Sequence, residues 1–539
     1  MLSIVDHSVS PPRVELPRRY NAAHDLVERN LLAGRADKLA YIDDRGRYTY
    51  GELAQRVNRV AHALIALGLQ PEDRIMVALH DTIDFPSVFL GAIKAGIIPI
   101  ATNTLLTTAD YRFMLEDSRA KALVVSAPLL DTFAPAIAGA AALREVIVSG
   151  EPPGLTAFPY YALSTLMNAA RDTFAPAVTT ADDPCFWLYS SGSTGTPKGT
   201  VHLHSSMIHT AELYARPILG LTEHDVVFSA AKLFFAYGLG NSLTFPLAVG
   251  ATAILMAERP TPEAVFQRLT TLQPTIFYGV PTLYGALMAS PALPPRAALR
   301  LRVCTSAGEA LPADIGQRFT AHFGVEILDG IGSTEMLHIF LSNRPGEVRY
   351  GTTGKPVPGY QIRLCDEAGA EVPAGVLGEL QIKGPSAALM YWNNRRQSTA
   401  TFMGPWTRAG DKYSVDAEGY YTYGGRSDDM LKVSGQYVSP FEVEGALLTH
   451  PAVLEVAVIG MPDEEGLVKP KAVIVLKPGV EETAELETQL KVHVKTRLAP
   501  HKYPRWISFV PELPKTATGK IQRFKLREEA TPTGVEESA

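Results

Sequence analysis

Cysteine is scarce in this sequence, since only Cys185, Cys304 and Cys365 occur among its 539 residues. They lie far apart and show no paired spacing, so neither a disulfide framework nor a zinc site is indicated. The N-terminal region also lacks the apolar run of a secretory signal, because Asp6 and several prolines fall within it. These absences predict a protein of the reducing cytoplasm.

A dominant charge of one sign is absent as well. The formal net charge is −6, from 50 basic and 56 acidic residues that are mixed along the chain. Proteins that bind nucleic acid usually concentrate basic residues on one face, and the sequence gives no sign of such a concentration. We therefore expect no nucleic-acid partner and favour chemistry on small molecules.

Long hydrophobic runs are rare, but one charge-free stretch, residues 233–257, is long enough to span a membrane. Gly238, Gly240, Pro246 and Gly250 interrupt it every few residues. No cluster of basic residues flanks it to fix the orientation of a membrane span. We expect a buried helix, a turn and a strand here, and no contact with a membrane.

The sequence does contain 46% hydrophobic residues, enough for more than one buried core. Amphipathic stretches alternate with short β-branched runs over residues 20–345, which predicts layered α/β structure. We predict an α/β protein with a large N-terminal domain, residues 1–427, made of layered α/β subdomains and a β-rich subdomain at about 350–425. A small, mobile α+β domain follows over residues 428–539, with the boundary near the polar Asp428.

The most distinctive short stretch is "YSSGSTGTPKG", residues 189–199. It fails the pattern of a Walker P-loop, because a glycine follows Lys198 where serine or threonine is required. Its glycines still permit close approach of the backbone, and its N–H and hydroxyl groups can bind an anion. The apolar run "CFWLY" places the loop at the end of a buried strand, where α/β proteins hold ligands. We expect a polyphosphate site, with a Ser/Gly linker as the alternative interpretation.

This loop resembles the signature loop of the adenylate-forming superfamily, which includes acyl-CoA and aryl-CoA ligases, adenylation domains of peptide synthetases and beetle luciferases. Five further motifs occur in the order of that family. They are "SAGEALP" (306–312), "DGIGSTE" (329–335), "TRAGD" (407–411), "GGRSDDMLKVSGQYVSP" (424–440) and "LPKTATGKIQR" (513–523). Together the six motifs cover nearly the whole chain, which makes the resemblance far more specific than any one motif.

In this superfamily the carboxylate of a substrate acid attacks the α-phosphate of ATP, and pyrophosphate leaves from an acyl-adenylate. The enzyme positions the reactants and neutralises charge, and needs no nucleophilic side chain. The resemblance implies that the opening loop binds the β- and γ-phosphates. Its implied residues are Ser190, Ser191, Gly192, Ser193, Thr194, Gly195, Thr196 and Lys198. Thr194 and Glu335 are implied to hold Mg²⁺, a hard cation that prefers oxygen ligands.

The rest of the nucleotide has implied partners too. Those for adenine are Gly308, Glu309, Ala310, Asp329, Gly330 and Ile331, and Thr334 is a further nucleotide-binding residue. Ile331 stands where the family commonly has an aromatic residue, so adenine would pack on an aliphatic side chain. Asp411 is implied to accept hydrogen bonds from the ribose hydroxyls, and Arg426 to contact ribose or phosphate.

Lys520, in "TGKIQR", is implied to reach the carboxylate and the α-phosphate during adenylation, where a lysine stabilises developing charge. It lies in a basic run with Lys515 and Arg523, for which a solvated surface is the alternative interpretation. With this assignment, Lys520, Thr194 and Glu335 are the predicted catalytic residues.

The small domain of the family rotates between two half-reactions, so that one active site serves both. Asp428 stands at the hinge position, where a proline would fix φ and impair at least one half-reaction. In the second step the thiol of coenzyme A attacks the acyl-adenylate, and Lys432 and Gly435 are implied to line the thiol tunnel. ATP, Mg²⁺ and coenzyme A are therefore expected.

The acid substrate is expected between two uncharged segments, residues 234–242 and 336–340. An uncharged pocket would leave the ammonium group of an amino acid unpaired, which weighs against a peptide-synthetase domain. Within the ligases, "FFAYGLGNS" and "DGIGSTEMLHIFLSN" are most similar to benzoate-type CoA ligases. The implied aryl pocket consists of Phe235, Ala236, Tyr237, Gly332, His338 and Ile339. Benzoate or a small substituted benzoate is favoured, and a cinnamate-like acid, another aryl acid or a medium-chain fatty acid stays open.

Two other classes stay open on the sequence alone. One is a luciferase-like oxygenase, and the other is a non-catalytic nucleotide-binding member of the fold. The joint presence of Thr194, Glu335, Asp411 and Lys520 favours a catalyst. We expect a small carboxylic acid, ATP and coenzyme A as partners, and leave self-association into a homodimer open.

Overall fold

The structure is a computed structural model that describes residues 2–151, 158–191, 197–427, 429–433, 436–463, 467–499, 502–515 and 521–530. The chain divides into two compact units. Unit 1 comprises Met1–Arg363 and Gln381–Ala409, and unit 2 comprises Leu364–Leu380 and Gly410–Ala539. Asp428, the predicted hinge, lies outside the described residues, so the domain boundary at 427/428 stays a prediction.

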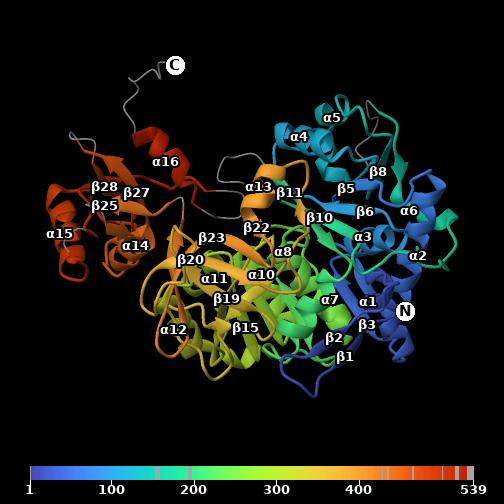
Figure 1. Cartoon of the computed structure of the whole chain (residues 1–539), viewed down its shortest axis with the longest axis horizontal. Coiled ribbons are helices and arrows are strands. Elements are labelled where there is room, and N and C mark those ends of the chain that lie inside the picture. The colour runs from blue at the N-terminus through green and yellow to red at the C-terminus, as the bar shows by residue number, and fades with distance from the viewer. Residues whose placement is uncertain are drawn as a thin grey trace. The chain divides into compact units, whose positions relative to one another are not determined.

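The first sheet of unit 1 has eight strands and a parallel centre. In spatial order these are β21 (Met390–Tyr391), β11 (Pro197–Leu203), β10 (Pro184–Ser191), β6 (Ile98–Ala101), β5 (Arg74–Ala78), β7 (Ala122–Ser126), β8 (Glu145–Ser149) and β9 (Tyr161–Ala162). Helices α4 (Thr108–Ser118) and α5 (Leu130–Ile137) pack on one face, and α2 (Tyr50–Ala66) and α3 (Asp84–Lys94) lie on the other (Figure 1). The sheet is thus buried on both faces, as its β-branched strands require.

The second sheet of unit 1 has nine strands, and its six central strands run parallel. In spatial order these are β18 (Lys355–Pro356), β17 (Ile339–Ser342), β16 (Ile327–Gly332), β15 (Val303–Ser306), β14 (Ile276–Gly279), β12 (Val226–Ser229), β13 (Thr252–Ile254), β3 (Leu39–Asp43) and β4 (Gly46–Thr49). Helices α10 (Pro262–Thr271), α11 (Pro281–Ala289) and α12 (Ala313–Phe323) cover one face and form a core with Phe277. The adjacent Tyr278 points to the opposite face, because side chains alternate along a strand.

The remaining elements of unit 1 are short. They are β1 (Ile4–Asp6), β2 (Arg13–Glu15), α1 (Ala22–Leu32), η1 (Ala127–Leu129), α6 (Leu163–Ala169), α7 (Ser206–Thr210), η2 (Ala211–Ala215), α8 (Ala236–Leu239), η3 (Gly240–Thr244), α9 (Phe245–Val249), η4 (Arg296–Ala298), α13 (Arg395–Thr401) and β22 (Phe402–Met403). The boundaries between the two units fall within three strands. These are β19 (Gln361–Cys365), β20 (Gly378–Lys383) and β23 (Trp406–Val415).

The charge-free stretch at 233–257 forms a loop, the short helices α8, η3 and α9, and strand β13. The prediction of a buried helix, a turn and a strand is therefore confirmed. Both η3 and the earlier η2 are π-helical, a rare geometry that often occurs at functional sites. No helix in the described part of the chain is long and apolar enough to cross a membrane.

Local sequence signals explain where the longest helix begins and which face it buries. At the start of α2, Thr49 Oγ1 accepts the N–H of Glu52 at 3.2 Å, and Glu52 Oε2 accepts the N–H of Thr49 at 2.7 Å. This reciprocal capping satisfies two N–H groups that a helix start leaves unpaired. Leu53, Val57 and Leu64 then recur at helical spacing and are buried.

Unit 2 contains the small α+β fold that the sequence predicts. Its further elements are β24 (Tyr421–Arg426), β25 (Leu431–Val433), β26 (Gln436–Val438), α14 (Pro440–Leu448), β27 (Val453–Pro462), β28 (Val468–Leu476), α15 (Ala484–Lys495), β29 (Trp506–Phe509) and α16 (Arg523–Ala530). Buried side chains of α14 and α15 form a core with β27 and β28. A buried pair, Arg523 with Glu444 at 2.8 Å, ties α16 to α14.

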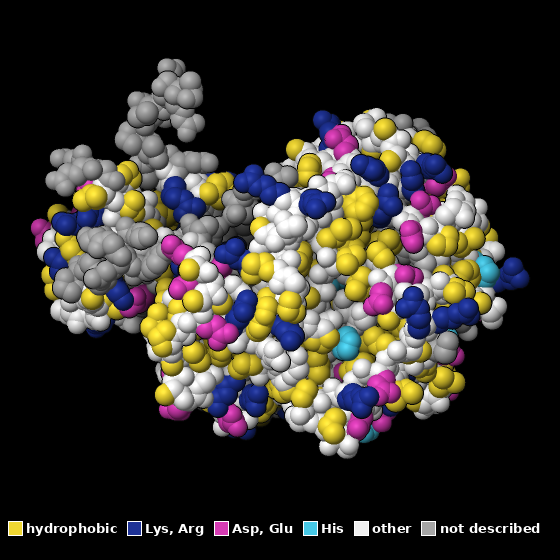
Figure 2. Space-filling view, viewed as in Figure 1, with side chains coloured by type: hydrophobic (Ala, Val, Ile, Leu, Met, Phe, Trp, Pro, Cys, Tyr) yellow, Lys and Arg dark blue, Asp and Glu magenta, His cyan; other side chains and the backbone are white. Residues whose placement is uncertain are grey.

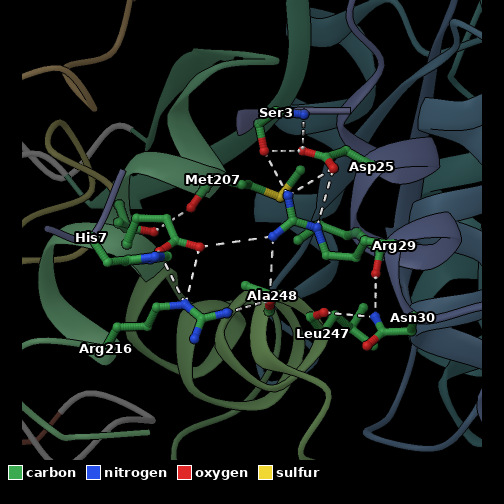
Figure 3. Close-up of polar contacts among 12 residues, drawn as sticks. Ser3, His7, Asp25, Arg29, Asn30, Met207, Arg216, Leu247 and Ala248 are labelled. Atoms are coloured by element: carbon green, nitrogen blue, oxygen red, sulfur yellow. Dashed lines mark hydrogen bonds and ion pairs between the residues drawn. The ribbon is translucent and has the colours of Figure 1, made fainter. Parts of the chain in front are cut away.

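A buried carboxylate, Glu212, fixes η2 to the N-terminal part of unit 1. It contacts His7 Nε2 at 2.7 Å, Arg216 Nε at 3.0 Å and Arg29 Nη1 at 3.8 Å. Figure 3 shows the side chains of His7, Arg29 and Arg216 converging from separate segments of the chain. A buried carboxylate needs such partners, because losing one would leave an uncompensated charge. The network therefore fixes the position of η2, which also carries Tyr214.

The predicted α/β class is confirmed by the two largely parallel sheets and the helices that cover them. Basic and acidic side chains are interspersed over the face of unit 1 seen in Figure 2, as they are along the sequence.

Candidate active site

Two paired strands hold the ends of the predicted phosphate loop. Strand β10 ends at Ser191 and β11 begins at Pro197, and Ser190 lies opposite Lys198 in the antiparallel pair. The Oγ atom of Ser190 is buried and has no hydrogen-bond partner in the described part of the chain. Such an atom is suited to a ligand oxygen, because a buried hydroxyl without a partner is unfavourable. The loop residues Gly192, Ser193, Thr194, Gly195 and Thr196 lie outside the described residues.

Glu335, the predicted magnesium ligand, lies in a turn after β16 and is held at two points. The hydroxyl of Tyr391 donates to Glu335 Oε1 at 2.6 Å. The carbonyl oxygen of Glu335 accepts the N–H of Ala388 at 2.7 Å. Lys198 Nζ lies 4.6 Å from the centroid of the Tyr391 ring, within the range of a cation–π contact. Tyr391 thus joins the predicted phosphate lysine to the predicted metal carboxylate.

His202 on β11 fixes the same turn through a further hydrogen bond. It is fully buried, and its Nε2 lies 2.7 Å from the carbonyl oxygen of Thr334. Burial lowers the pKa of His202 to about 4, so the ring is neutral at pH 7 and Nε2 donates its hydrogen to that carbonyl. The ring also stacks on Phe186, with centroids 5.2 Å apart. His202 therefore positions Thr334, next to Glu335.

Replacing Tyr391 by phenylalanine removes one hydrogen bond to Glu335 and keeps the ring beside Lys198. We expect the Mg²⁺ concentration for half-maximal adenylation to rise roughly tenfold, because partners of metal ligands contribute that much. The KM for the acid should stay unchanged. Magnesium titrations of pyrophosphate release check this.

The matched control for that variant is Tyr20→Phe, since the hydroxyl of Tyr20 also donates to a carboxylate, Asp25 Oδ2, at 2.8 Å. It should leave the magnesium dependence unchanged. An equal shift in both variants would show that Tyr391 has no special relation to the metal site.

The residues predicted for adenine lie at the carboxyl ends of two adjacent parallel strands. Gly308, Glu309 and Ala310 follow β15, and the stretch 329–331 lies within β16, just before its last residue, Gly332. Ser306 pairs with Asp329 across the two strands. This edge is where α/β sheets bind nucleotides, so the structure brings the two predicted stretches together. Gly308 has a φ of +94°, which only glycine adopts readily.

Asp329 is unusual within this group. Its side chain is buried, and its Oδ1 has no hydrogen-bond partner in the described part of the chain. Burial raises the pKa of the Asp329 carboxyl well above its usual range, which favours the neutral form. A neutral carboxyl can donate a hydrogen bond as well as accept one, which suits a neighbouring nucleobase.

In unit 2 the predicted ribose residues lie opposite each other. Asp411 on β23 pairs with Arg426 on β24, and Arg426 Nη1 lies 3.4 Å from Asp411 Oδ1. Gly410 has a φ of +73°, and a Cβ there would lie 3.1 Å from Arg426 Nη2. The arginine therefore neutralises the carboxylate next to a glycine that leaves space for it.

Other predicted residues of unit 2 are beyond the described structure. Lys520 and Gly435 lie outside the described residues. Lys432 belongs to strand β25, but its side chain is outside the described part of the chain. Their roles stay predictions.

The predicted acid pocket is in unit 1, and His338 is at its centre. The side chain is 2% exposed, and Nε2 lies 3.2 Å from the carbonyl oxygen of Tyr237 and 3.1 Å from Asn241 Oδ1. Burial lowers the pKa of His338 to about 3, so the ring is neutral and Nε2 donates to these acceptors. The rings of Phe245, Tyr214 and Tyr237 surround it at centroid distances of 4.4, 5.5 and 5.6 Å.

Tyr237 packs against the second sheet. Its hydroxyl lies 2.5 Å from Thr305 Oγ1, and its ring meets Tyr278 edge-on at 6.3 Å. Gly332 lies next to the backbone of His338, and a Cβ at Gly332 would be 2.6 Å from that backbone. The surroundings of His338 are thus aromatic and uncharged, and glycine is required where the backbones approach.

Several buried polar atoms around this region have no hydrogen-bond partner in the described part of the chain. They are Tyr214 Oη, Tyr278 Oη, Ser306 Oγ, Asp329 Oδ1 and His338 Nδ1. Native proteins leave few such atoms, so a group of them in one region indicates the place of a ligand or of ordered water.

The predicted pocket residues are brought together with residues that the sequence did not indicate. Phe235 caps α8, Ala236 and Tyr237 form its first turn, and Ile339 begins β17 beside His338. Tyr214 was missed, and Asn241 lies in the predicted segment 234–242 without having been named as a pocket residue. They belong to the π-helical segments η2 and η3 respectively. A single sequence shows no signal for π-helices, because they differ from α-helices only in hydrogen-bond register.

Gly240→Ala tests the packing of the pocket, because the new methyl carbon would lie 2.2 Å from Cδ2 of His338. The ring must shift, so we expect the KM for the acid to rise about tenfold. Overpacking should also destabilise the protein by about 1–3 kcal/mol. Steady-state kinetics and thermal unfolding measure the two effects.

Gly445→Ala is the control, since it lies in α14 with no atom within 4 Å of the added carbon. It should leave KM unchanged and stabilise the helix by up to about 1 kcal/mol. An unchanged KM in the Gly240→Ala variant would show that His338 is not part of the acid site.

Comparison with known proteins agrees with this arrangement. The family model of the AMP-binding enzymes matches residues 28–392, and the model of their C-terminal domain matches residues 442–520. The chain is 66% identical to the benzoate–CoA ligase of Thauera aromatica, over 98% of this chain and 99% of that protein.

Two solved structures are similar along almost their whole length. A benzoate CoA ligase from Burkholderia xenovorans shares 58% identity with a TM-score of 0.88, covering 94% of this chain and 100% of that one. An anthranilate CoA ligase in complex with anthranoyl-AMP shares 43% identity with a TM-score of 0.90, covering 96% and 98%. These matches confirm the resemblance and the fold that the ordered motifs predict.

Proposed function

Because the chain belongs to the family of AMP-binding enzymes, we propose that it is an AMP-forming ligase that converts benzoate, or a small substituted benzoate, to the CoA thioester. In the first step a carboxylate oxygen of benzoate bonds to the α-phosphorus of ATP, and pyrophosphate leaves. In the second step the thiol of coenzyme A attacks the acyl carbon of the benzoyl-adenylate, and AMP leaves with the electron pair of the broken bond.

The observation that supports this substrate is the pocket around His338. A neutral histidine surrounded by Tyr214, Tyr237 and Phe245 gives flat apolar walls that match an aryl ring. A charged ring substituent would be buried without a partner, which is costly. The pocket therefore favours an aryl acid without a charged ring substituent over an amino acid.

The other predicted residues act on ATP, on coenzyme A or on the movement between the two steps. We assign the phosphates to Ser190, Lys198 and the loop between β10 and β11, and adenine to the edge formed by Gly308 and Asp329. Asp411 and Arg426 take the ribose. Lys520 supplies positive charge to the carboxylate and the α-phosphate as the new bond forms. Lys432 and Gly435 line the path of coenzyme A, and Asp428 is the hinge between the two steps.

The donor set fits Mg²⁺ as the accompanying metal. Glu335 offers a carboxylate whose Oε1 is fixed by Tyr391 at 2.6 Å. Mg²⁺ commonly takes one or two protein oxygens and completes its shell with water and phosphate oxygens. Glu335 and the hydroxyl of Thr194 would hold it, and when bound it would neutralise charge on the phosphates. The proposal includes a cytoplasmic location, in keeping with three free, buried thiols.

A panel of acids tests the function. Release of AMP, dependent on both ATP and coenzyme A, is measured with benzoate, 2-aminobenzoate, cinnamate, hexanoate and acetate. We expect the highest kcat/KM with benzoate, and lower values as the acid becomes larger or loses its ring. A preference for hexanoate or acetate would refute the aryl assignment, and AMP release without coenzyme A, accompanied by light, would indicate an oxygenase.

A further inference from the structure

A buried carboxylate outside the predicted site is hydrogen-bonded to the segment that leads into the acid pocket. Asp81 follows β5 of the first sheet and is 4% exposed. Both of its carboxylate oxygens accept the N–H of Leu233, at 3.2 and 3.3 Å. Leu233 lies 152 positions away and begins the stretch that leads into α8. Asp81 therefore reaches across to the loop that carries the aryl-pocket residues.

Backbone hydrogen bonds on either side of Leu233 connect the contact with Asp81 to the residues of the acid pocket. The carbonyl of Lys232 accepts the N–H of Phe235 at 3.0 Å, and the carbonyl of Phe235 accepts the N–H of Leu239 at 2.8 Å. A Cβ at Gly238 would lie 2.1 Å from the Lys232 carbonyl oxygen, so helix and turn are in close contact. Moving Leu233 would thus move α8, which carries Ala236 and Tyr237.

The charged side chain of Lys232 fixes the same turn as well. The ammonium of Lys232 donates to the carbonyl oxygens of Met256 and Glu258, the latter at 2.6 Å. The attraction between Lys232 and Asp81 favours the ionised form of both groups. The turn is therefore held both by a carboxylate and by two carbonyls.

We propose that Asp81 is a positioning residue for the acid substrate. Asp81 fixes the position at which the chain enters α8, and thereby the position of the Tyr237 ring. The inference rests on the proposed function, because it concerns the pocket assigned to benzoate. Asp81 itself contacts neither the substrate nor the reacting atoms. It acts through the backbone of Leu233, and its charge makes acid binding sensitive to pH.

The direction of the pH dependence follows from the surroundings of Asp81. Burial raises the pKa of Asp81 to about 6, and the Lys232 ammonium and the N–H of Leu233 oppose that rise. His80 on the same loop also interacts electrostatically with Lys232, and Glu258, Arg268 and Asp44 interact with the same ammonium. Above about pH 6 the carboxylate is charged and holds the turn. Below it the attraction to Lys232 is lost, so the KM for benzoate should rise.

Steady-state kinetics of the full-length enzyme at saturating ATP test this between pH 5.5 and 8. Benzoate stays ionised over that range, because carboxylic acids titrate near pH 4. Asp81→Ala should raise the KM for benzoate about tenfold and leave the KM for ATP within twofold. Asp81→Asn keeps an acceptor oxygen, so it should raise that KM less and abolish its increase at low pH.

Asp84→Asn is the matched control, since Asp84 is a buried carboxylate three positions later that bonds to Arg45 at 3.0 Å and to Ser149 at 2.7 Å. It should leave the KM for benzoate within twofold. If Asp81→Ala does not fold, the pH profile of Asp81→Asn decides: a profile equal to that of the unaltered enzyme overturns the proposal. Equal increases in both KM values would also overturn it. Loss of benzoate activity in the unaltered enzyme would instead reject the proposed function.

Discussion

Lys520→Ala is expected to abolish formation of benzoyl-adenylate and to preserve thioester formation from adenylate supplied in its place. The physical reason is that charge develops on the carboxylate and the α-phosphate only in the first step. Removing one preorganised group that stabilises such charge typically costs about 10²–10³-fold in rate. Pyrophosphate release measures the first step, and benzoyl-CoA formation from synthetic benzoyl-adenylate measures the second.

A second lysine in the same basic run supplies the control for Lys520. Lys515 Nζ bonds to Glu455 Oε1 at 2.7 Å in a partly exposed pair. Such surface pairs contribute about 0–1 kcal/mol, so Lys515→Ala should leave both steps unchanged. If Lys520→Ala slowed both half-reactions equally, Lys520 would have a structural role or a role common to both steps.

Glu335→Gln is expected to lower the rate of adenylation by roughly a hundredfold, through weaker binding of Mg²⁺. The substitution keeps the size of the side chain and its contact with Tyr391, and removes the negative charge that attracts the cation. Thioester formation from supplied adenylate should be affected much less, because no pyrophosphate leaves in that step. Magnesium titrations of both half-reactions distinguish these outcomes.

Glu326→Gln provides the comparison for this variant. Glu326 precedes β16, and its Oε2 accepts the N–H of Gly346 at 2.8 Å. It should retain the magnesium dependence of the unaltered enzyme. A Glu335→Gln enzyme with an unchanged requirement for Mg²⁺ would show that another group holds the cation.

The sequence predicted much of the fold because its strongest signals are local. The alternation of amphipathic and β-branched stretches indicated the layered α/β structure of unit 1, and glycines at 238, 240 and 250 argued against a membrane span. The ordered motifs also predicted that Asp411 and Arg426 belong to one site. The structure brings these two side chains within 3.4 Å of each other, although ribose binding itself stays a prediction.

What could not be predicted depends on contacts between distant segments. Tyr391 bonds to Glu335 across 56 positions, and His202 to Thr334 across 132. Each residue lies on a strand of the first sheet and reaches a turn of the second, an arrangement that depends on the packing of whole layers. The contact of Asp81 with Leu233 could not be predicted for the same reason, since the two residues are 152 positions apart. One sequence without relatives contains no signal for such pairs.

The most direct test of the central claim is a two-stage reaction with the purified chain. Benzoate, ATP and Mg²⁺ are first mixed with enzyme at substrate-level concentration, and coenzyme A is then added. We predict about one equivalent of benzoyl-adenylate and pyrophosphate in the first stage, and its conversion to benzoyl-CoA and AMP in the second. The assignment as an AMP-forming benzoate ligase is contradicted if no benzoyl-adenylate forms before coenzyme A is added, or if ADP rather than AMP appears.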